Sequence, residues 1–283
     1  MSGVRIGDER LLAGGLGFLE GIRWHRGEFW FSDFYARKVR SVDPQGTLTD
    51  RYYVSGQPSG LGPQGDDMLI ASMYDGRVLR GAPDGSLKVV ADVGASYRGS
   101  LNDMTVDAHG RAYVSTLPDL SKLVPGSAVT PGCPIYLVDE HGKVRIVADG
   151  LAVPNGMAIT PDGATLIVAE TRASRLVKFS IDPDGSLGPL EVFAELGASR
   201  PDGICLDPSG AVWACSPMTS EFLLVADGGR VLAVQETPGS WSVACAVDGD
   251  GSTLGVLTAE VTLDDFHHGT GTGAVRAYRI EGR

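Results

Sequence analysis

Residues 154–170 read PNGMAITPDGATLIVAE, in which a tight turn, Pro161-Asp162-Gly163, separates a short apolar segment from the strand-like run Thr165–Glu170. Glycine at such a turn supplies the positive φ that a tight hairpin requires. The stretch therefore predicts two antiparallel strands joined by a hairpin. The same arrangement recurs along the whole chain, and its spacing carries the prediction of the fold.

Six turns of this kind, each placed between a short apolar segment and a strand-like run, divide the chain into units. They lie at residues 25–27, 63–65, 108–110, 161–163, 208–210 and 249–251. The runs that follow them are Glu28–Asp33, Met68–Met73, Ala112–Thr116, Thr165–Glu170, Ala211–Ser216 and Thr253–Thr258. A second set of turns alternates with the first, and one of its members lies between the predicted strands Ile135–Val138 and Val144–Ala148. Each unit therefore consists of four strands.

Four-stranded units at a spacing of roughly 40 to 50 residues are typical of propeller blades. We therefore expect an all-β fold, a six-bladed β-propeller with four antiparallel strands per blade, in a single domain over residues 1–283. The sixth unit lacks a fourth strand after Ala274–Ile280, whereas the N-terminal run Val4–Leu12 has no unit of its own. This run is expected to join the last blade and close the ring, which removes open sheet edges. The alternative, a two-sheet sandwich, would not explain six copies of the unit.

Charge and composition exclude several classes of function. The net charge is -11 and the pI about 4.9, without a basic cluster, so the chain does not carry the cationic face that nucleic acids or anionic membranes require. No apolar stretch approaches the roughly 20 residues of a membrane span, and no signal core follows the N-terminus. The four cysteines form no C-x-x-C pair and are expected to be reduced and buried. A cytoplasmic location is the default expectation.

Polar residues mark the starts of the innermost strands, which line the channel of a propeller. These starts read Leu19–Ile22, Ser59–Leu61, Leu101–Met104, Pro154–Met157, Pro201–Ile204 and Ser242–Cys245. Most carry a polar residue at nearly the same place, so these side chains should converge on one end of the channel. The chain has only two asparagines, Asn102 and Asn155, and both occupy this position although asparagine is a common turn residue.

The set Glu20, Asn155 and Asp202 is the candidate metal site. Two carboxylates and an amide oxygen in a narrow space would repel one another without a cation. Oxygen ligands favour a hard divalent ion, so we expect one metal ion, calcium first, with Mg²⁺, Mn²⁺ or Zn²⁺ as alternatives. Incomplete coordination by the protein would leave room for water and substrate. A structural calcium ion without chemistry remains the alternative, and either asparagine could instead satisfy backbone groups at the channel mouth.

Four motifs resemble the senescence-marker protein, gluconolactonase and luciferin-regenerating-enzyme family. They are Glu20-Gly21-Ile22-Arg23-Trp24, Asn102-Asp103-Met104 with Asp107 and Gly110, Pro154-Asn155-Gly156-Met157, and Arg200-Pro201-Asp202-Gly203-Ile204 running on to Trp213. The resemblance implies a six-bladed propeller with a divalent metal held by Glu20, Asn155 and Asp202. It also implies that Asn102 contacts the substrate and that Asp202 is the general base or orients the attacking water. Members of the family commonly hydrolyse sugar lactones and related cyclic esters.

One departure from the family pattern concerns the substrate. Sugar-lactone members often carry an arginine two residues before the substrate-binding asparagine, where this chain has Ser100; Arg98 lies two residues further off. An acidic residue expected in the following loop has no clear match, since Leu120 falls near that position with Asp119 adjacent. The pattern favours a lactone or ester less polar than gluconolactone.

The substrate is expected to contact Asn102, Asp103, Ser100 and Trp241, with the indole of Trp241 packing against it.

The sequence leaves other classes of function open. A non-catalytic calcium-binding protein and a protein-interaction propeller are the alternatives to a hydrolase. His267 and His268 precede a Gly/Thr-rich stretch and are interpreted as part of a mobile surface loop, with a paired-histidine base as the alternative.

Overall fold

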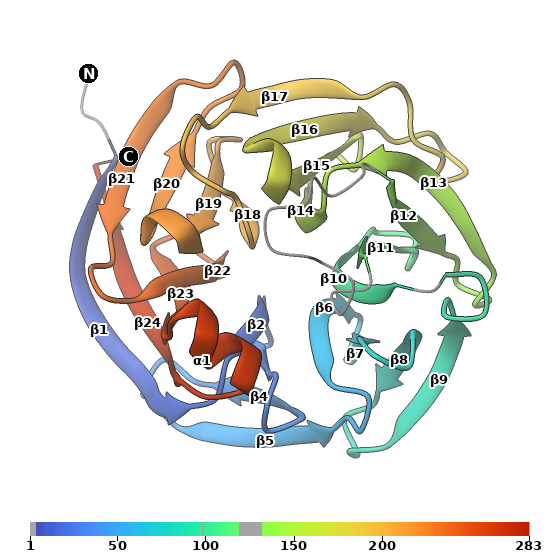
Figure 1. Ribbon diagram of the computed structural model, residues 1–283, viewed down its shortest axis with the longest axis horizontal. Coiled ribbons are helices and arrows are strands. Elements are labelled where there is room, and N and C mark those ends of the chain that lie inside the picture. The colour runs from blue at the N-terminus through green and yellow to red at the C-terminus, as the bar shows by residue number, and fades with distance from the viewer. Residues whose placement is uncertain (1–3, 98, 119–131, 283) are drawn as a thin grey trace.

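The computed structural model describes residues 4–97, 99–118 and 132–282, which form six four-stranded antiparallel sheets around a central axis (Figure 1). The predicted six-bladed β-propeller is confirmed. Blades I to III are β2 (Leu19–His25), β3 (Glu28–Asp33), β4 (Lys38–Val42) and β5 (Leu48–Tyr53); β6 (Pro58–Gln64), β7 (Asp67–Ser72), β8 (Arg77–Gly81) and β9 (Leu87–Asp92); β10 (Ser100–Val106), β11 (Ala112–Leu117), β12 (Cys133–Val138) and β13 (Val144–Leu151). Blades IV to VI are β14 (Pro154–Ile159), β15 (Thr165–Glu170), β16 (Arg175–Ser180) and β17 (Glu191–Glu195); β18 (Ile204–Leu206), β19 (Val212–Ser216), β20 (Glu221–Val225) and β21 (Val231–Glu236); β22 (Trp241–Val247), β23 (Thr253–Glu260), β24 (Thr272–Glu281) and β1 (Arg5–Leu16).

The ring is closed by the N-terminal strand, as the sequence predicts. β1 pairs antiparallel with β24, from Arg5 opposite Glu281 to Leu16 opposite Gly273. Glu9 reinforces the junction by accepting a hydrogen bond from the Tyr278 hydroxyl at 2.8 Å. The first and last segments of the chain therefore lie in one sheet, blade VI. Because β1 leads directly into β2 of blade I, this pairing joins the last blade to the first.

Three short helical segments interrupt the strands within the described residues. Two are the 3₁₀ turns η2 (Thr171–Ala173) and η3 (Pro217–Thr219), and one is the α-helix α1 (Leu263–His268). The histidines predicted to lie in a surface loop are therefore the last residues of a helix, because a capping box between Thr262 and Asp265 starts α1 and Gly269 ends it with a φ of 69°. None of the helices among the described residues is long and apolar enough to cross a membrane.

The blades pack on one another through apolar faces. Between blades V and VI, for example, Trp213 and Phe222 pack in one cluster with Cys245 and Tyr278. All four cysteines are free; three are buried, and Cys205 is partly exposed with its Sγ 3.6 Å from that of Cys245. The four cysteines form no disulfide, as predicted, and the predicted burial holds for all of them except Cys205.

Glycines allow the innermost strands to approach one another near the axis. A Cβ on Gly60 would lie 2.3 Å from the Met104 nitrogen, and one on Gly156 would lie 2.5 Å from the Asp202 carbonyl oxygen. Any side chain at either position would displace the backbone of the next blade. This close approach brings the polar residues that precede these glycines to one narrow mouth.

Candidate active site

Irregular pairing between the first two strands of a blade recurs at the mouth of the channel. The register shifts between Glu20 and Arg23 in β2, between Leu101 and Met104 in β10, and between Pro154 and Met157 in β14. Such bulges re-aim side chains and are common beside functional sites. They occur where the sequence places the candidate polar residues.

Asn102 and Asn155 are joined by a hydrogen bond between blades III and IV. Asn102 Nδ2 donates to Asn155 Oδ1 at 2.9 Å, and Asn155 lowers the pKa of Asp202 in blade V. Thr171 supports the two asparagines, because it accepts from Asn155 Nδ2 at 3.3 Å and donates to the Pro201 carbonyl at 2.7 Å. The two asparagines therefore lie in direct contact with each other, and Asp202 lies close to Asn155.

Glu20 and Asp202 are close enough for their charges to interact. Burial raises the pKa of Glu20 well above its usual value, and the charges of Asp202 and Asp103 raise it further. Burial also raises the pKa of Asp202 to about 8, with a further contribution from Asp103 and a partial offset from the Asn155 hydrogen bond. Both side chains keep part of their surface open at the mouth. The structure thus brings Glu20, Asn155 and Asp202 together rather than directing them to separate regions.

The donor set fits a hard cation. Two acidic side chains whose ionised forms are disfavoured by burial and mutual repulsion would be stabilised by a divalent ion between them. Rotation of the Asn155 amide exchanges Nδ2 and Oδ1 and would turn an oxygen toward that ion. Across the described ranges, no three His, Cys, Asp or Glu side chains are arranged to hold a metal ion. The amide oxygen is therefore an essential part of the candidate set.

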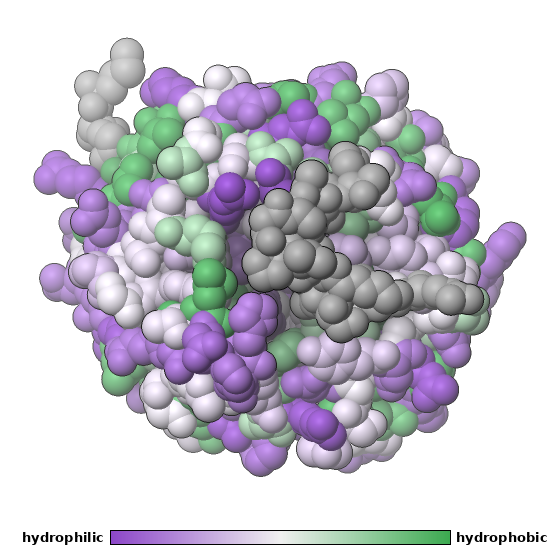
Figure 2. Space-filling view, viewed as in Figure 1, coloured by the Kyte–Doolittle hydropathy of each residue, from purple (hydrophilic) through white to green (hydrophobic). Residues whose placement is uncertain are grey.

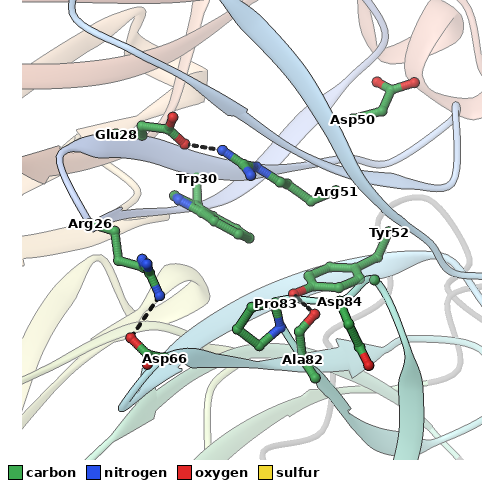
Figure 3. Close-up of a pocket in the computed structure, with 11 residues that line it drawn as sticks. Arg26, Glu28, Trp30, Asp50, Arg51, Tyr52, Asp66, Ala82, Pro83 and Asp84 are labelled. Atoms are coloured by element: carbon green, nitrogen blue, oxygen red, sulfur yellow. Dashed lines mark hydrogen bonds and ion pairs between the residues drawn. The ribbon is translucent and has the colours of Figure 1, made fainter.

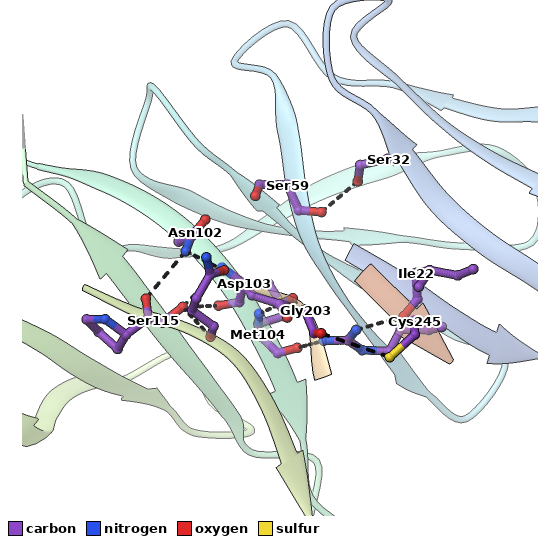
Figure 4. A network of polar contacts seen from close by, with 12 residues as sticks. Ile22, Ser32, Ser59, Asn102, Asp103, Met104, Ser115, Gly203 and Cys245 are labelled. Atoms are coloured by element: carbon purple, nitrogen blue, oxygen red, sulfur yellow. Dashed lines mark hydrogen bonds and ion pairs between the residues drawn. The ribbon is translucent and has the colours of Figure 1, made fainter. Parts of the chain in front are cut away.

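Asp103 is buried and forms an ion pair with Arg23; Figure 4 shows Asp103 among the polar contacts of this region. Its Oδ1 accepts from Arg23 Nη2 and from the Met104 nitrogen, each at 2.8 Å, and its side chain is 8% exposed. Ser115 Oγ holds the same segment, because it accepts from the Asp103 nitrogen at 3.1 Å and its single hydroxyl hydrogen lies within reach of the Asp103 and Asn155 carbonyl oxygens, each 3.1 Å away. Asp103 was expected to contact substrate, whereas these contacts place its carboxylate in an ion pair with Arg23.

Arg23 belongs to the first family motif, but the motif alone predicts no role for it. An arginine on a buried inner strand requires a partner for its charge. Asp103 supplies that partner, at a position where four other inner strands carry glycine: Gly21, Gly60, Gly156 and Gly203. Arg23 and Asp103 both depart from the residue types of the other repeats, and they lie on strands far apart in sequence. These two departures together could have predicted the ion pair.

Replacing Arg23 with methionine is expected to lower the free energy of unfolding by about 3–5 kcal/mol, because Asp103 would keep a buried charge without a partner. The double variant Arg23→Met/Asp103→Asn should recover a large part of the loss, since it removes both charges. Urea denaturation of the three proteins measures the effect. Equal stability of the single and double variants would show that the ion pair does not support this part of the channel.

Ser100 and Trp241 occupy opposite parts of the mouth. Ser100 is partly exposed at the start of β10, and Trp241 is partly exposed directly before the buried Ser242 of blade VI. The Trp241 ring lies 6.4 Å from that of Phe18 and 6.1 Å from that of Phe266. Arg98, Asp119 and Leu120, which bear on the family's substrate residues, lie outside the described residues.

Of the cavities in the described part of the chain, two lie away from these residues. A cavity of about 550 Å³ is lined by Trp30, by the hairpin residues Arg26 and Asp66, and by other turn residues of blades I and II, so it lies at the end of the blades opposite the mouth (Figure 3). Arg26 pairs with Asp66 at 2.7 Å, and Arg51 pairs with Glu28 while stacking over Trp30. The arginines in this cavity already have acidic partners. The other cavity, of about 320 Å³, lies further along the channel beside Arg23 and Cys205.

A ring of six blades that gathers carboxylates and amides at one end of its channel defines a propeller protein with a polar site on its axis. The chain belongs to the SMP-30/Gluconolactonase/LRE-like family, whose sequence pattern matches residues 18–260. This confirms the resemblance that the four motifs indicated.

Individual known proteins also resemble this chain. The chain is similar to a pentonolactonase of Haloferax volcanii, with 27% identity over 87% of this chain and 76% of the relative. It is also similar to a 6-deoxy-6-sulfogluconolactonase of Pseudomonas putida, with 24% identity over 78% of this chain and 75% of the relative. Among solved structures, the calcium-binding protein regucalcin from Agrobacterium tumefaciens shares the fold with a TM-score of 0.80 and 24% identity, covering 98% of this chain and 96% of that one.

Proposed function

We propose that this chain is a divalent-metal-dependent hydrolase of lactones or related esters. The observation that carries the proposal is the pair of carboxylates, Glu20 and Asp202, whose charges interact at a mouth that also holds two hydrogen-bonded asparagines. The lactonases among the curated relatives support lactone hydrolysis as the reaction class. An ester carbonyl at this mouth would lie beside both a proton acceptor and amide donors.

Glu20, Asn155 and Asp202 would hold one divalent ion, calcium first, with Mg²⁺, Mn²⁺ or Zn²⁺ as alternatives. Such an ion, when bound, polarises a carbonyl oxygen and lowers the pKa of a water molecule. Calcium is favoured because its flexible coordination accepts carboxylate and amide oxygens together with several waters.

Asp202 is the proposed general base. Its ionised carboxylate accepts a proton from the attacking water, whose oxygen forms a bond to the lactone carbonyl carbon. The bond between that carbon and the ring oxygen then breaks, and the same proton passes from Asp202 to the departing alkoxide. With a divalent ion bound beside it, Asp202 would keep the ionised form that the first step requires.

The remaining residues bind and position. Asn102 Nδ2, which donates to Asn155 in this structure, is proposed to hydrogen-bond a substrate oxygen. Ser100 and Trp241 are proposed to contact the substrate from opposite parts of the mouth. Asp103, held by Arg23, is proposed to fix the backbone of the segment that carries Asn102 rather than to contact the substrate.

Chelation is expected to abolish hydrolysis of a panel of lactones, and one of the four divalent ions should restore it when chelator is removed. Proton release in a pH-stat measures the reaction for each ion. Undiminished activity in the chelated protein would contradict the metal-dependent proposal. A tightly bound ion without hydrolysis of any lactone or ester would instead favour the non-catalytic calcium-binding alternative.

A further inference from the structure

Four aromatic side chains form one side of the mouth, and we call them the aromatic wall: Phe18, Tyr35, Trp241 and Phe266. The Phe18 ring lies 4.9 Å from Phe266, 6.2 Å from Tyr35 and 6.4 Å from Trp241 between centroids. Phe18 is buried at the centre of the group, and the other three are partly exposed. The wall therefore presents aromatic surface to solvent around a packed core.

The aromatic wall adjoins the proposed ligands. Phe18 lies two residues before Glu20, and Trp241 is the first residue of β22, the innermost strand of blade VI. The Tyr35 ring lies 6.2 Å from that of Phe18, which directly precedes the start of β2, and Glu20 is the second residue of that strand.

The wall is held in place by α1, so its aromatic surface is preformed. The Tyr35 hydroxyl donates to the Phe266 carbonyl oxygen at 2.5 Å, and the capping box fixes the start of the helix. In Figure 1, α1 lies beside the central opening on the side of β2 and β22. Figure 2 shows a small group of green, hydrophobic residues at the left side of the central hollow, over the region of β22, with purple residues over much of α1.

Partly exposed aromatic faces beside a polar site favour particular substrates. A sugar lactone carries hydroxyl groups around its ring, and hydroxyls placed against aromatic rings would lose hydrogen bonds to water without replacement. An alkyl or aryl substituent would instead bury apolar area against the same rings, at about 25 cal/mol per Å². The opposite side of the mouth, with Asn102 and Thr171, can bind the ester oxygens.

We infer that the aromatic wall is the subsite for an apolar substituent of the substrate, and that the preferred substrates are lactones bearing an alkyl or aryl group. The inference rests on the proposed lactone hydrolysis and adds to it the class of lactone. It assigns Tyr35, Trp241 and Phe266 to substrate specificity, and it places α1 at the site although the helix carries none of the proposed ligands.

The test compares kcat/KM for a γ-lactone with a pentyl substituent, the unsubstituted γ-lactone and a pentonolactone. The wild-type protein should prefer the pentyl compound by about tenfold or more. Phe266→Ala should lose most of that preference, with a smaller loss on the unsubstituted lactone, and Phe266→Leu should fall between them. Tyr53→Ala removes an exposed aromatic ring from the outer strand β5 and should leave the preference unchanged. A wild-type preference for the pentonolactone would overturn the inference while leaving lactone hydrolysis intact.

Binding of the pentyl-substituted γ-lactam, which resists hydrolysis, separates the two proposals. Calorimetry should give about tenfold tighter binding to the wild-type protein than to Phe266→Ala, and tighter binding than that of the unsubstituted lactam. That result without hydrolysis of any lactone would refute the proposed reaction and retain the apolar subsite. Equal binding of the two lactams to the wild-type protein would refute the subsite.

Discussion

Replacing Asp202 with asparagine is expected to lower kcat for lactone hydrolysis by about a hundred- to ten-thousand-fold, the usual contribution of a general base. Asparagine has nearly the same shape and retains an oxygen ligand, but its amide cannot accept the proton of the attacking water. The loss should appear mainly in kcat, because the variant removes proton transfer rather than substrate contacts. Initial rates across substrate concentrations measure both parameters.

The matched control is Asp162→Asn, in an exposed turn of blade IV where Asp162 accepts hydrogen bonds from Thr160 and Ala164. It should retain wild-type activity. Metal content must be measured alongside, because a variant without its ion would lose activity for a different reason. An Asp202→Asn protein that keeps both its ion and its kcat would show that the base lies elsewhere.

Metal-dependent stabilisation is expected to be large and to increase with pH. Folding raises the pKa of Asp202 to about 8 in the metal-free protein, and that of Glu20 is also raised. A raised carboxyl pKa means that the folded state binds the proton more tightly than the unfolded state, so stability is lost as pH rises from about 4 through 8. A divalent ion that replaces those protons should reverse the loss.

Thermal unfolding of the chelated protein, with and without added ion, measures this effect at pH 5.5 and pH 8.5. At one fixed ion concentration, about 100 times the Kd at pH 8.5, stabilisation of about 2.7 kcal/mol is expected at that pH, or roughly 5–10 °C in Tm. The increase should be larger at pH 8.5, because fewer protons compete with the ion. Turn aspartates such as Asp43 should not contribute to the change in stability between pH 5.5 and pH 8.5, because backbone hydrogen bonds hold the pKa of Asp43 below its usual value. A larger increase at pH 5.5 would contradict the assignment of Glu20 and Asp202 as ligands.

The fold was predictable because its determinants are local and repeated. Glycine turns and alternating apolar runs specify each hairpin, and β3 and β15 have the predicted bounds. The unpaired run at the N-terminus and the missing strand of the last unit together predicted the pairing of β1 with β24. Repetition of one unit gave six independent indications of the same architecture.

The candidate ligands were predictable for a related reason, since each occupies an equivalent place in a different repeat. The ion pair of Arg23 with Asp103 was not predicted, because it joins two residues that depart from the repeat on separate blades. Helix α1 was missed because six residues are too few for a helical hydrophobic pattern, and its stability comes from capping and from packing of Phe266. Features that depend on contacts between distant loops leave little trace in local sequence.

The most direct test of the shared-cation claim is a crystal structure of the protein grown with Mn²⁺, with anomalous diffraction used to locate the ion. We expect one strong peak at the channel mouth, within about 2.0–2.6 Å of oxygens from Glu20, Asn155 and Asp202. A peak elsewhere with none at the mouth, or a mouth that stays without an ion at saturating Mn²⁺, would contradict it.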